Sequence, residues 1–245
     1  MSESLLSVAN LRKSFGALLV VDDVSFDVAG GEVLGVMGPN GAGKTTMLNL
    51  VSGALPADDG RIALAGHDVT RLGVVGRCRR GVGRTHQVPR PFERMSVFEN
   101  VLVGATNGGA AIGARRRDHY RLASEAIERS GLSGKANRLA GSLPLLDRKR
   151  LELARALATA PRVLLLDEIA GGLTEPEVKQ LVVLVLELRD SGLGIVWIEH
   201  VVHALMATVD RLMALTYGRV IAQGEPRAVM ASEELQHAYL GTVAP

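Results

Sequence analysis

A glycine-rich segment that ends in a lysine and a threonine has the residue types and the spacing that bind nucleotide phosphates. It directly follows an apolar run at residues 32–37, and we expect it to open a helix that extends to about Ser52. Glycines let backbone N–H groups converge on phosphate oxygens, and the helix N-terminus adds the positive end of its dipole. Lys44 would reach the β- and γ-phosphates, and the Thr45 hydroxyl would ligate Mg²⁺. The segment reads Gly38-Pro39-Asn40-Gly41-Ala42-Gly43-Lys44-Thr45.

Two adjacent carboxylates follow the apolar run at residues 163–166. A buried strand would deliver Asp167 and Glu168 to the carboxyl edge of a sheet, where open α/β sheets bind their ligands. There Asp167 would hold Mg²⁺ through its water shell, and Glu168 would polarise the attacking water that phosphoryl transfer needs. The alternative is an acidic pair that merely caps the next helix. The phosphate-binding segment favours the magnesium and catalytic roles.

His200 and Gln87 could belong to the same site. His200 follows Glu199 and the strand that we expect at residues 195–198, so it would lie on the γ-phosphate side of the sheet edge. The neutral amide of Gln87 could ligate Mg²⁺ or the attacking water, and a loop position would let it move as the site fills. By itself, either residue could be incidental: a histidine at a strand end, or a glutamine on the surface. The order of the motifs favours a shared catalytic site.

The pattern of turns and apolar runs predicts an α/β fold that can position these side chains. Closely spaced strands near the N-terminus indicate an antiparallel layer, whereas the later strand-helix alternation indicates a parallel sheet covered on both faces. We expect strands at residues 5–11, 18–28, 32–37, 61–64, 163–166, 195–198 and 211–215. We expect helices within residues 97–159, with glycine-rich breaks at 107–113 and 130–134, and further helices at 176–189 and 201–209. Pro176 would occupy the first position of its helix.

Composition excludes several function classes. The chain has 245 residues, of which 47% are hydrophobic and 22% charged, and its net charge of +2 is too small to indicate a nucleic-acid partner. We expect the basic clusters at residues 77–80 and 115–117 to form solvated helical faces. Cys78 is the only cysteine, so no internal disulfide can form. No secretory signal is expected at the N-terminus. No apolar run approaches the ~20 residues that cross a bilayer, so a membrane role would require docking.

In this order the motifs resemble those of the ABC ATPase family over essentially the whole chain. The resemblance implies a P-loop NTPase fold with an antiparallel β subdomain, Mg-ATP as substrate, a head-to-tail dimer with a second ABC ATPase subunit, and docking onto transmembrane permease subunits. It also implies one ATPase domain, with a core at residues 1–88 and 160–245 and a helical subdomain at about 89–159. The matching segments are Gly38 to Thr46 (Walker A), Gln87 (Q-loop), Val163 to Glu168 (Walker B), Gly172-Leu173-Thr174-Glu175-Pro176 (D-loop), His200 (switch histidine) and Phe15, at the place of the adenine-stacking aromatic.

Several segments are similar to the ATPases of branched-chain (hydrophobic) amino-acid importers. This similarity implies a cytoplasmic protein held on the inner face of the plasma membrane by its permease. Lipid and lipopolysaccharide exporter ATPases share much of the pattern, so export remains an alternative. The transported molecule itself stays open, because the motor contacts the permease and not the cargo. The segments are residues 84–87 (Arg-Thr-His-Gln), 91–101, 150–159, 198–200 (Ile-Glu-His) and 238–241.

One segment departs from the family. Ahead of the helix at residues 148–159 the family has a Leu-Ser-Gly-Gly-Gln signature, whereas this chain has Leu143-Pro144-Leu145-Leu146-Asp147. Proline supplies neither a hydroxyl nor an N–H, and leucines replace glycines whose small size permits close approach to phosphate. Asp147 would suit a helix cap, but its charge would repel a γ-phosphate. A smaller departure is Ile169, where proline is usual.

Two other classes of ABC protein compete with a transporter motor. One acts on DNA or ribosomes, but such members have long coiled-coil insertions or tandem ATPase domains, and neither is present. The other is a regulator with an inactive site, which the complete set of catalytic residues argues against.

We further expect residues 91–101, which mix Phe92 and Phe98 with charged side chains, to form part of a permease-docking surface. The alternative is ordinary packing of the helical subdomain.

Overall fold

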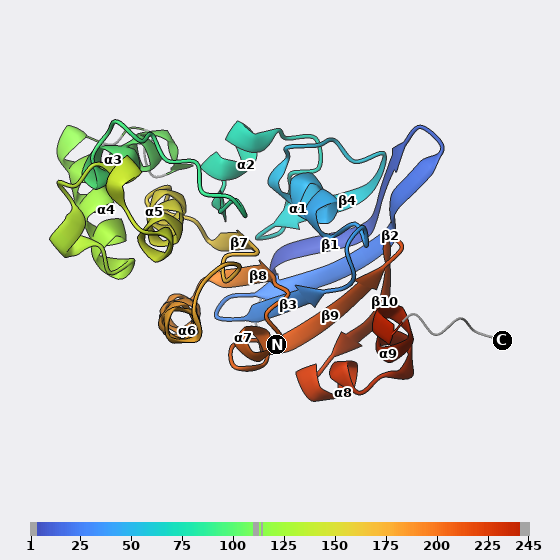
Figure 1. The fold of residues 1–245 in the computed structure, drawn as a ribbon. Coiled ribbons are helices and arrows are strands. Elements are labelled where there is room, and N and C mark those ends of the chain that lie inside the picture. The colour runs from blue at the N-terminus through green and yellow to red at the C-terminus, as the bar shows by residue number, and fades with distance from the viewer. Residues whose placement is uncertain (1–3, 110–112, 114, 241–245) are drawn as a thin grey trace.

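Two β-sheets and a group of helices make up the computed structural model, which describes residues 4–109, 113 and 115–240 (Figure 1). The first sheet has four antiparallel strands in the order β2-β1-β4-β5 and confirms the antiparallel layer expected near the N-terminus. A hairpin joins its two long strands, with Phe15 opposite Leu18 at the turn. The strands are β1 (Ser4–Phe15), β2 (Leu18–Ala29), β4 (Asp59–Leu64) and β5 (His67–Asp68).

The second sheet contains the parallel core and has the order β10-β9-β3-β8-β7-β6. All neighbours pair in parallel except β10, which pairs antiparallel with β9 at one edge. The sequence did not indicate β6 at the other edge, because that strand has only three residues. The strands are β3 (Val33–Met37), β6 (Val82–Arg84), β7 (Val163–Asp167), β8 (Gly194–Ile198), β9 (Arg211–Thr216) and β10 (Arg219–Gly224).

Both faces of this core sheet are covered, as strand β7 illustrates. Val163 and Leu165 face a cluster formed with α1 and the antiparallel sheet, whereas Leu164 and Leu166 face a cluster formed with the other helices. Successive side chains of a strand point to opposite faces, so a strand buried on both sides is apolar throughout. The acidic Asp167 ends this apolar run at the carboxyl edge of the sheet.

The helices divide between the core and a separate group. Helices α3, α4 and α5 pack against one another, and Figure 1 shows them gathered at one end, away from the β1–β2 hairpin. Residues 4–109 and 115–240 contain no helix both long and apolar enough to span a bilayer. The α-helices are α1 (Lys44–Ser52), α2 (Val74–Arg79), α3 (Val97–Asn107), α4 (Arg116–Arg129), α5 (Leu145–Leu157), α6 (Glu175–Asp190), α7 (Val202–Met206), α8 (Pro226–Met230) and α9 (Glu233–Leu240), and the 3₁₀ turns are η2 (Ser133–Lys135) and η3 (Ala140–Ser142).

Two local expectations are corrected, and one cannot be compared with the structure. Helix α7 ends at Met206, because the Thr208 N–H turns back to the Leu205 carbonyl before β9 begins. Helix α6 begins at Glu175, one residue before Pro176, because the Thr174 side chain and Glu177 cap each other there. Gly241, the last residue of a segment similar to the importer ATPases, lies outside the described residues.

The expectation that residues 77–80 form a solvated face is wrong for Arg77. Its side chain is buried and donates hydrogen bonds to the carbonyls at the end of α1 and in the turn before α2. The guanidinium therefore satisfies orphan carbonyls at the C-terminal end of α1. The acceptors are the carbonyls of Leu50, Val51, Thr70 and Leu72.

Candidate functional site

The phosphate loop runs between β3 and α1 and takes the conformation that its glycines permit. Gly38, Gly41 and Gly43 all have positive φ, at 153°, 81° and 95°. A Cβ at Gly38 would lie 2.0 Å from the Leu215 carbonyl oxygen, and one at Gly43 would lie 2.5 Å from that of Val20. Larger residues therefore cannot occupy these two positions without moving β9 or β2.

Lys44 is the first residue of α1 and points back into this loop. Its ammonium group donates to the carbonyl oxygens of Gly38 at 2.7 Å and Pro39 at 2.9 Å. Burial lowers the pKa of Lys44, and the carboxylates of Glu168 and Asp167 oppose that shift. A largely buried cation thus lies at a helix N-terminus, close to the two acidic residues that end β7.

Asp167 is held at the sheet edge by Arg84, the last residue of β6. The guanidinium lies 3.2 Å from Asp167 Oδ2 and also donates to Asn49 and Ser52 of α1, at 2.6 and 3.0 Å. Burial is the largest cause that raises the pKa of Asp167, while Arg84 acts to lower it. Asp167 Oδ1 is buried and has no hydrogen-bond partner among the residues described. A buried oxygen of this kind normally has a partner, either a hydrogen-bond donor such as water or a bound cation.

Glu168 receives side chains from two other segments. Gln87 donates its amide N–H to Oε2, and Nε2 of His200 lies 2.7 Å from Oε1. The Glu168 backbone has a φ of 48°, which is uncommon outside glycine, and its N–H is fixed by the Ile198 carbonyl at 2.9 Å. Backbone strain of this kind concentrates at functional sites. The structure therefore brings the three predicted catalytic side chains together.

A depression of about 210 Å³ lies over the phosphate loop. The Thr45 side chain is exposed there, and Glu168 is the acidic residue of its lining. Phe15 does not line this depression. The residue is 48% exposed at the hairpin turn, with the Lys13 ammonium 5.7 Å from the ring centre, so packing between the strands does not bury it. The lining residues are Val20, Asn40, Gly41, Ala42, Gly43, Lys44, Thr45, Thr46 and Glu168.

The residues present suit a magnesium ion bound together with a nucleotide. The described part of the chain has no cluster of three or more His, Cys, Asp or Glu side chains that could hold a metal by itself. Mg²⁺ commonly takes only one or two protein oxygens and completes its shell with water and substrate phosphates. The unpartnered Asp167 oxygen and the exposed Thr45 hydroxyl match that donor set. The Gln87 amide oxygen could join them, because its nitrogen faces Glu168.

The segment Leu143 to Asp147 differs from its expected structure. Pro144, not Asp147, is the N-cap of α5, and it makes no side-chain capping bond. Asp147 is 2% exposed and its Oδ2 lies 2.5 Å from the Lys135 ammonium group. The aspartate is therefore neutralised inside the helical group, where turn η2 brings the lysine to it. Leu145 is exposed, and a Cβ at Gly172 would lie 3.3 Å from its side chain.

Sequence reasoning missed three charged residues around the site. The sequence places Arg84 and Glu199 in segments similar to the importer ATPases but predicts no role for either of them. It predicts no role for Lys149. Lys149 is buried on α5 and donates to the Glu168 carbonyl oxygen at 3.2 Å. The sequence feature that could have indicated these residues is a charged side chain in or beside an apolar run. Arg84 lies three residues before Gln87, Glu199 directly precedes His200, and Lys149 precedes a run of buried residues on α5.

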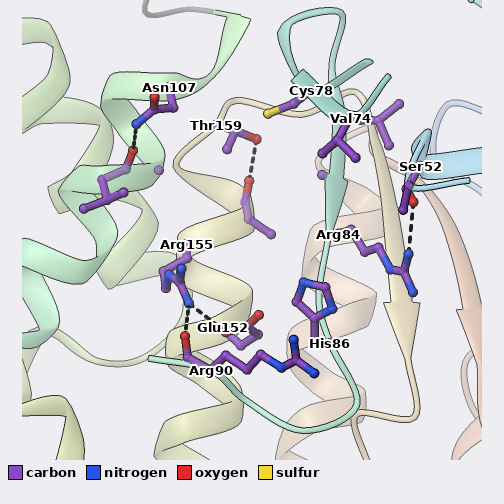
Figure 2. A pocket seen from close by; sticks show the side chains of 16 residues that line it. Ser52, Val74, Cys78, Arg84, His86, Arg90, Asn107, Glu152, Arg155 and Thr159 are labelled. Atoms are coloured by element: carbon purple, nitrogen blue, oxygen red, sulfur yellow. Dashed lines mark hydrogen bonds and ion pairs between the residues drawn. The ribbon is translucent and has the colours of Figure 1, made fainter. Parts of the chain in front are cut away.

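A second, mainly apolar cavity of about 490 Å³ lies between α2, β6, α3 and α5 (Figure 2). His86 and Arg90 enter it from the segment after β6, and Arg155 on α5 bonds to the Arg90 carbonyl at 2.8 Å and to Glu152 at 3.0 Å. It is larger than the depression at the phosphate loop. The nucleotide belongs at the loop, however, because the helix N-terminus and Lys44 lie there.

The fold and the phosphate loop define a P-loop nucleotide-binding protein. The model of the ABC transporter family matches residues 21–171. The chain belongs to that family and is the ATP-hydrolysing motor of an ABC transporter.

Relatives of two kinds resemble the chain over its full length. It is 38% identical over 253 residues to the high-affinity branched-chain amino acid transport ATP-binding protein LivG of Salmonella typhimurium, covering 98% of this chain and 99% of LivG. It is 35% identical over 238 residues to the lipopolysaccharide export system ATP-binding protein LptB of Haemophilus influenzae, covering 97% and 98%. A crystal structure of the ADP conformation of an ATP-binding cassette of an ABC transporter superposes with a TM-score of 0.88 at 30% identity, covering 97% and 99%.

Proposed function

We propose that this ATPase drives a transporter that imports branched-chain or other hydrophobic amino acids or related small solutes. The observation that supports it most is the 38% identity to LivG, which extends over nearly all of both chains. Export of a lipid or lipopolysaccharide is the second candidate, supported by the 35% identity to LptB over a similar length. In either case we place the chain on the cytoplasmic face of the membrane, held there by permease subunits.

The site residues have separate roles in the proposed hydrolysis of ATP. Loop N–H groups and Lys44 bind the phosphates, and Phe15 stacks on the adenine. Glu168 accepts a hydrogen bond from the attacking water and directs it in line at the γ-phosphorus, while His200 and Gln87 hold the carboxylate in place. When bound, Mg²⁺ neutralises charge on the β- and γ-phosphates, and Asp167, Thr45 and Gln87 are the residues that would hold it.

We propose that the 490 Å³ cavity is where a permease segment docks. Its lining carries more cationic than acidic side chains, since Arg84, Arg90 and Arg155 accompany the single Glu152. Its lining includes the exposed Val74, and the exposed Phe92 lies nearby, with its ring 5.1 Å from the guanidinium carbon of the lining residue Arg155. An amphipathic helix with carboxylates suits such a groove. Residues 91–101, the predicted docking stretch, begin beside it.

A pull-down followed by reconstitution tests this function. Tagged chain captured from detergent-solubilised membranes of the source cells should bring permease subunits with it, and crosslinkers at positions 90 to 98 should reach them. The complex in proteoliposomes should then take up radiolabelled leucine on addition of ATP, and a Glu168→Gln complex should not. Co-purification with ribosomes or DNA alone would refute a transporter role. ATP-driven extraction of lipopolysaccharide in place of leucine uptake would favour export.

A further inference from the structure

Glu199 is a buried carboxylate that the proposed hydrolysis does not use. Its side chain lies at the end of β8 and is only 1% exposed. Oε2 accepts the Ala170 N–H at 2.8 Å, and Oε1 accepts the His200 N–H at 3.0 Å, with the Val201 N–H more distant at 3.4 Å. Among the described residues, no Lys, Arg or His nitrogen lies within 4.0 Å of this carboxylate. Backbone N–H groups therefore compensate for most of its lost hydration.

The hydrogen bonds of Glu199 connect the two segments that carry the catalytic pair. Ala170 follows Glu168 by two residues on the segment after β7, and His200 adjoins Glu199 on the segment after β8. The pair also meets directly, through His200 Nε2 and Glu168 Oε1 at 2.7 Å. Besides the backbone bond from the Glu168 N–H to the Ile198 carbonyl, the two segments are thus joined through the Glu199 carboxylate and through the catalytic side chains themselves.

A third element contacts this connection. Lys149 on α5 donates to the Glu168 carbonyl at 3.2 Å. Its pKa is lowered by burial, while the negative charge of Glu199, and to a smaller degree that of Glu168, opposes the shift. The helix whose first turn contains Leu145 to Asp147 therefore reaches the backbone of the predicted water-polarising glutamate.

We infer that Glu199 is a positioning residue for ATP hydrolysis: its carboxylate fixes His200 against Glu168. The inference rests on the roles proposed above for those two residues. A carboxylate suits the task because it has two oxygens, each an acceptor, and can bind N–H groups from two segments at once. Glutamine has the same shape but only one acceptor oxygen, so in a Glu199→Gln variant an amide N–H would face a backbone N–H. One of the two segments would then lose its anchor.

Steady-state hydrolysis of Mg-ATP by the full-length chain tests the inference. Glu199→Gln should lower kcat about ten- to a hundredfold, the cost of a small misplacement of catalytic groups. KM and the affinity for ATP should stay unchanged, because Glu199 does not contact the phosphate loop. The control is Glu32→Gln directly before β3, where Glu32 accepts the Ala29 N–H at 2.7 Å and pairs with Arg211 at 2.8 Å, away from the phosphate loop. This control should lose thermal stability without losing kcat.

A double-mutant cycle separates positioning from general stability. If Glu199 acts through His200, then Glu199→Gln should reduce kcat far less in a His200→Ala background than in the wild type. Should Glu199→Gln fail to fold, Glu199→Asp keeps the charge but shortens the reach, and it should show the same loss confined to kcat. Equal losses in both backgrounds, or a normal kcat with Glu199 altered, would overturn the inference. Normal turnover of Glu168→Gln and His200→Ala in the same assay would instead refute the catalytic roles proposed for those two residues.

Discussion

His200 and Glu168 face each other across the ends of two neighbouring parallel strands, with 2.7 Å between Nε2 and Oε1. Gln87 approaches the other carboxylate oxygen from the segment after β6. Three strand ends, widely separated in the sequence, therefore converge on one carboxylate. That carboxylate also lines the depression over the phosphate loop. This arrangement makes Glu168 the residue whose substitution should separate nucleotide binding from hydrolysis.

Substitution of Glu168 by glutamine should abolish turnover and preserve ATP binding. The amide keeps the shape of the side chain but cannot polarise a water with a negative charge, and the loss of a general base typically costs about a hundredfold or more in rate. Phosphate release and ATP affinity should be measured on the same preparation. Hydrolysis near the normal rate would show that another group directs the water.

Substitution of Lys44 by alanine should act on binding instead. Hydrogen bonds to charged groups contribute about 1.5–3 kcal/mol, so the loss of the ammonium should weaken ATP affinity by about ten- to a hundredfold. A fluorescent ATP analogue titrated into both proteins would measure this difference. Lys179→Ala is a suitable control, because that lysine is exposed on α6 and its salt-bridge partner is Glu175, one turn earlier on the same helix. An unchanged affinity would remove Lys44 from the phosphate site.

The catalytic arrangement was predictable because it depends on short motifs at strand ends. A parallel sheet brings the carboxyl ends of its strands to one edge, so Asp167, Glu168 and His200 had to come close together once β7 and β8 were recognised. The phosphate loop was equally clear, since only glycine fits the contacts at Gly38 and Gly43. These features follow from local sequence and from the rules of sheet topology.

Partners contributed by distant segments were not predictable from spacing. Arg77 was expected to be solvated, because a basic cluster on a short helix is usually exposed; here, carbonyls from α1 and from the turn before α2 surround it. Likewise, Asp147 was expected to cap α5, but Lys135 is brought to it by turn η2. The spacing of apolar residues in the sequence predicts which face of a helix is buried, whereas the partner of a buried charge depends on tertiary packing.

The buried position of Arg77 predicts a strong effect on stability. Arg77→Met keeps much of the apolar stem but leaves several buried carbonyls without a donor, so the free energy of unfolding should fall by about 2 to 4 kcal/mol. Arg79→Met, two residues along the same helix, removes an exposed guanidinium and should change stability little. Urea unfolding of both variants would measure the difference. Equal stability losses would contradict the role of Arg77 as a cap for α1.

Lys135→Met should destabilise the helical group through Asp147. The variant leaves a buried carboxylate without its partner, at a cost of about 1 to 3 kcal/mol. Because the lysine side chain is 37% exposed, we expect a value in the lower part of that range. The thermal midpoint of Lys135→Met should recover when Asp147→Leu is added, since the unpaired charge is then removed. Failure of this second change to restore stability would show that the ion pair is not what holds the segment.

The altered signature should weaken ATP-driven pairing of two ATPase subunits. In the head-to-tail dimer that the family resemblance implies, the start of α5 in one chain would meet the nucleotide on the other. Pro144 and Leu145 are exposed there, whereas Leu146 and Asp147 are buried and support the fold. Pro144→Ser combined with Leu145→Gly therefore restores a hydroxyl donor and close approach without disturbing the Lys135 pair. If the natural partner is a different ATPase with an intact signature, only one of the two composite sites would be impaired.

Sedimentation of the Pro144→Ser, Leu145→Gly variant, with and without ATP, would measure this pairing. Both proteins should carry Glu168→Gln so that ATP persists. A regained hydrogen bond to a charged phosphate contributes about 1.5–3 kcal/mol, so the dimerisation constant should rise about ten- to a hundredfold. Val183→Ser, which removes an exposed apolar group from α6, controls for a general change in surface hydrophobicity. Unchanged pairing would mean that backbone N–H groups at the start of α5 already contact the phosphate adequately, and that Pro144 and Leu145 do not limit closure.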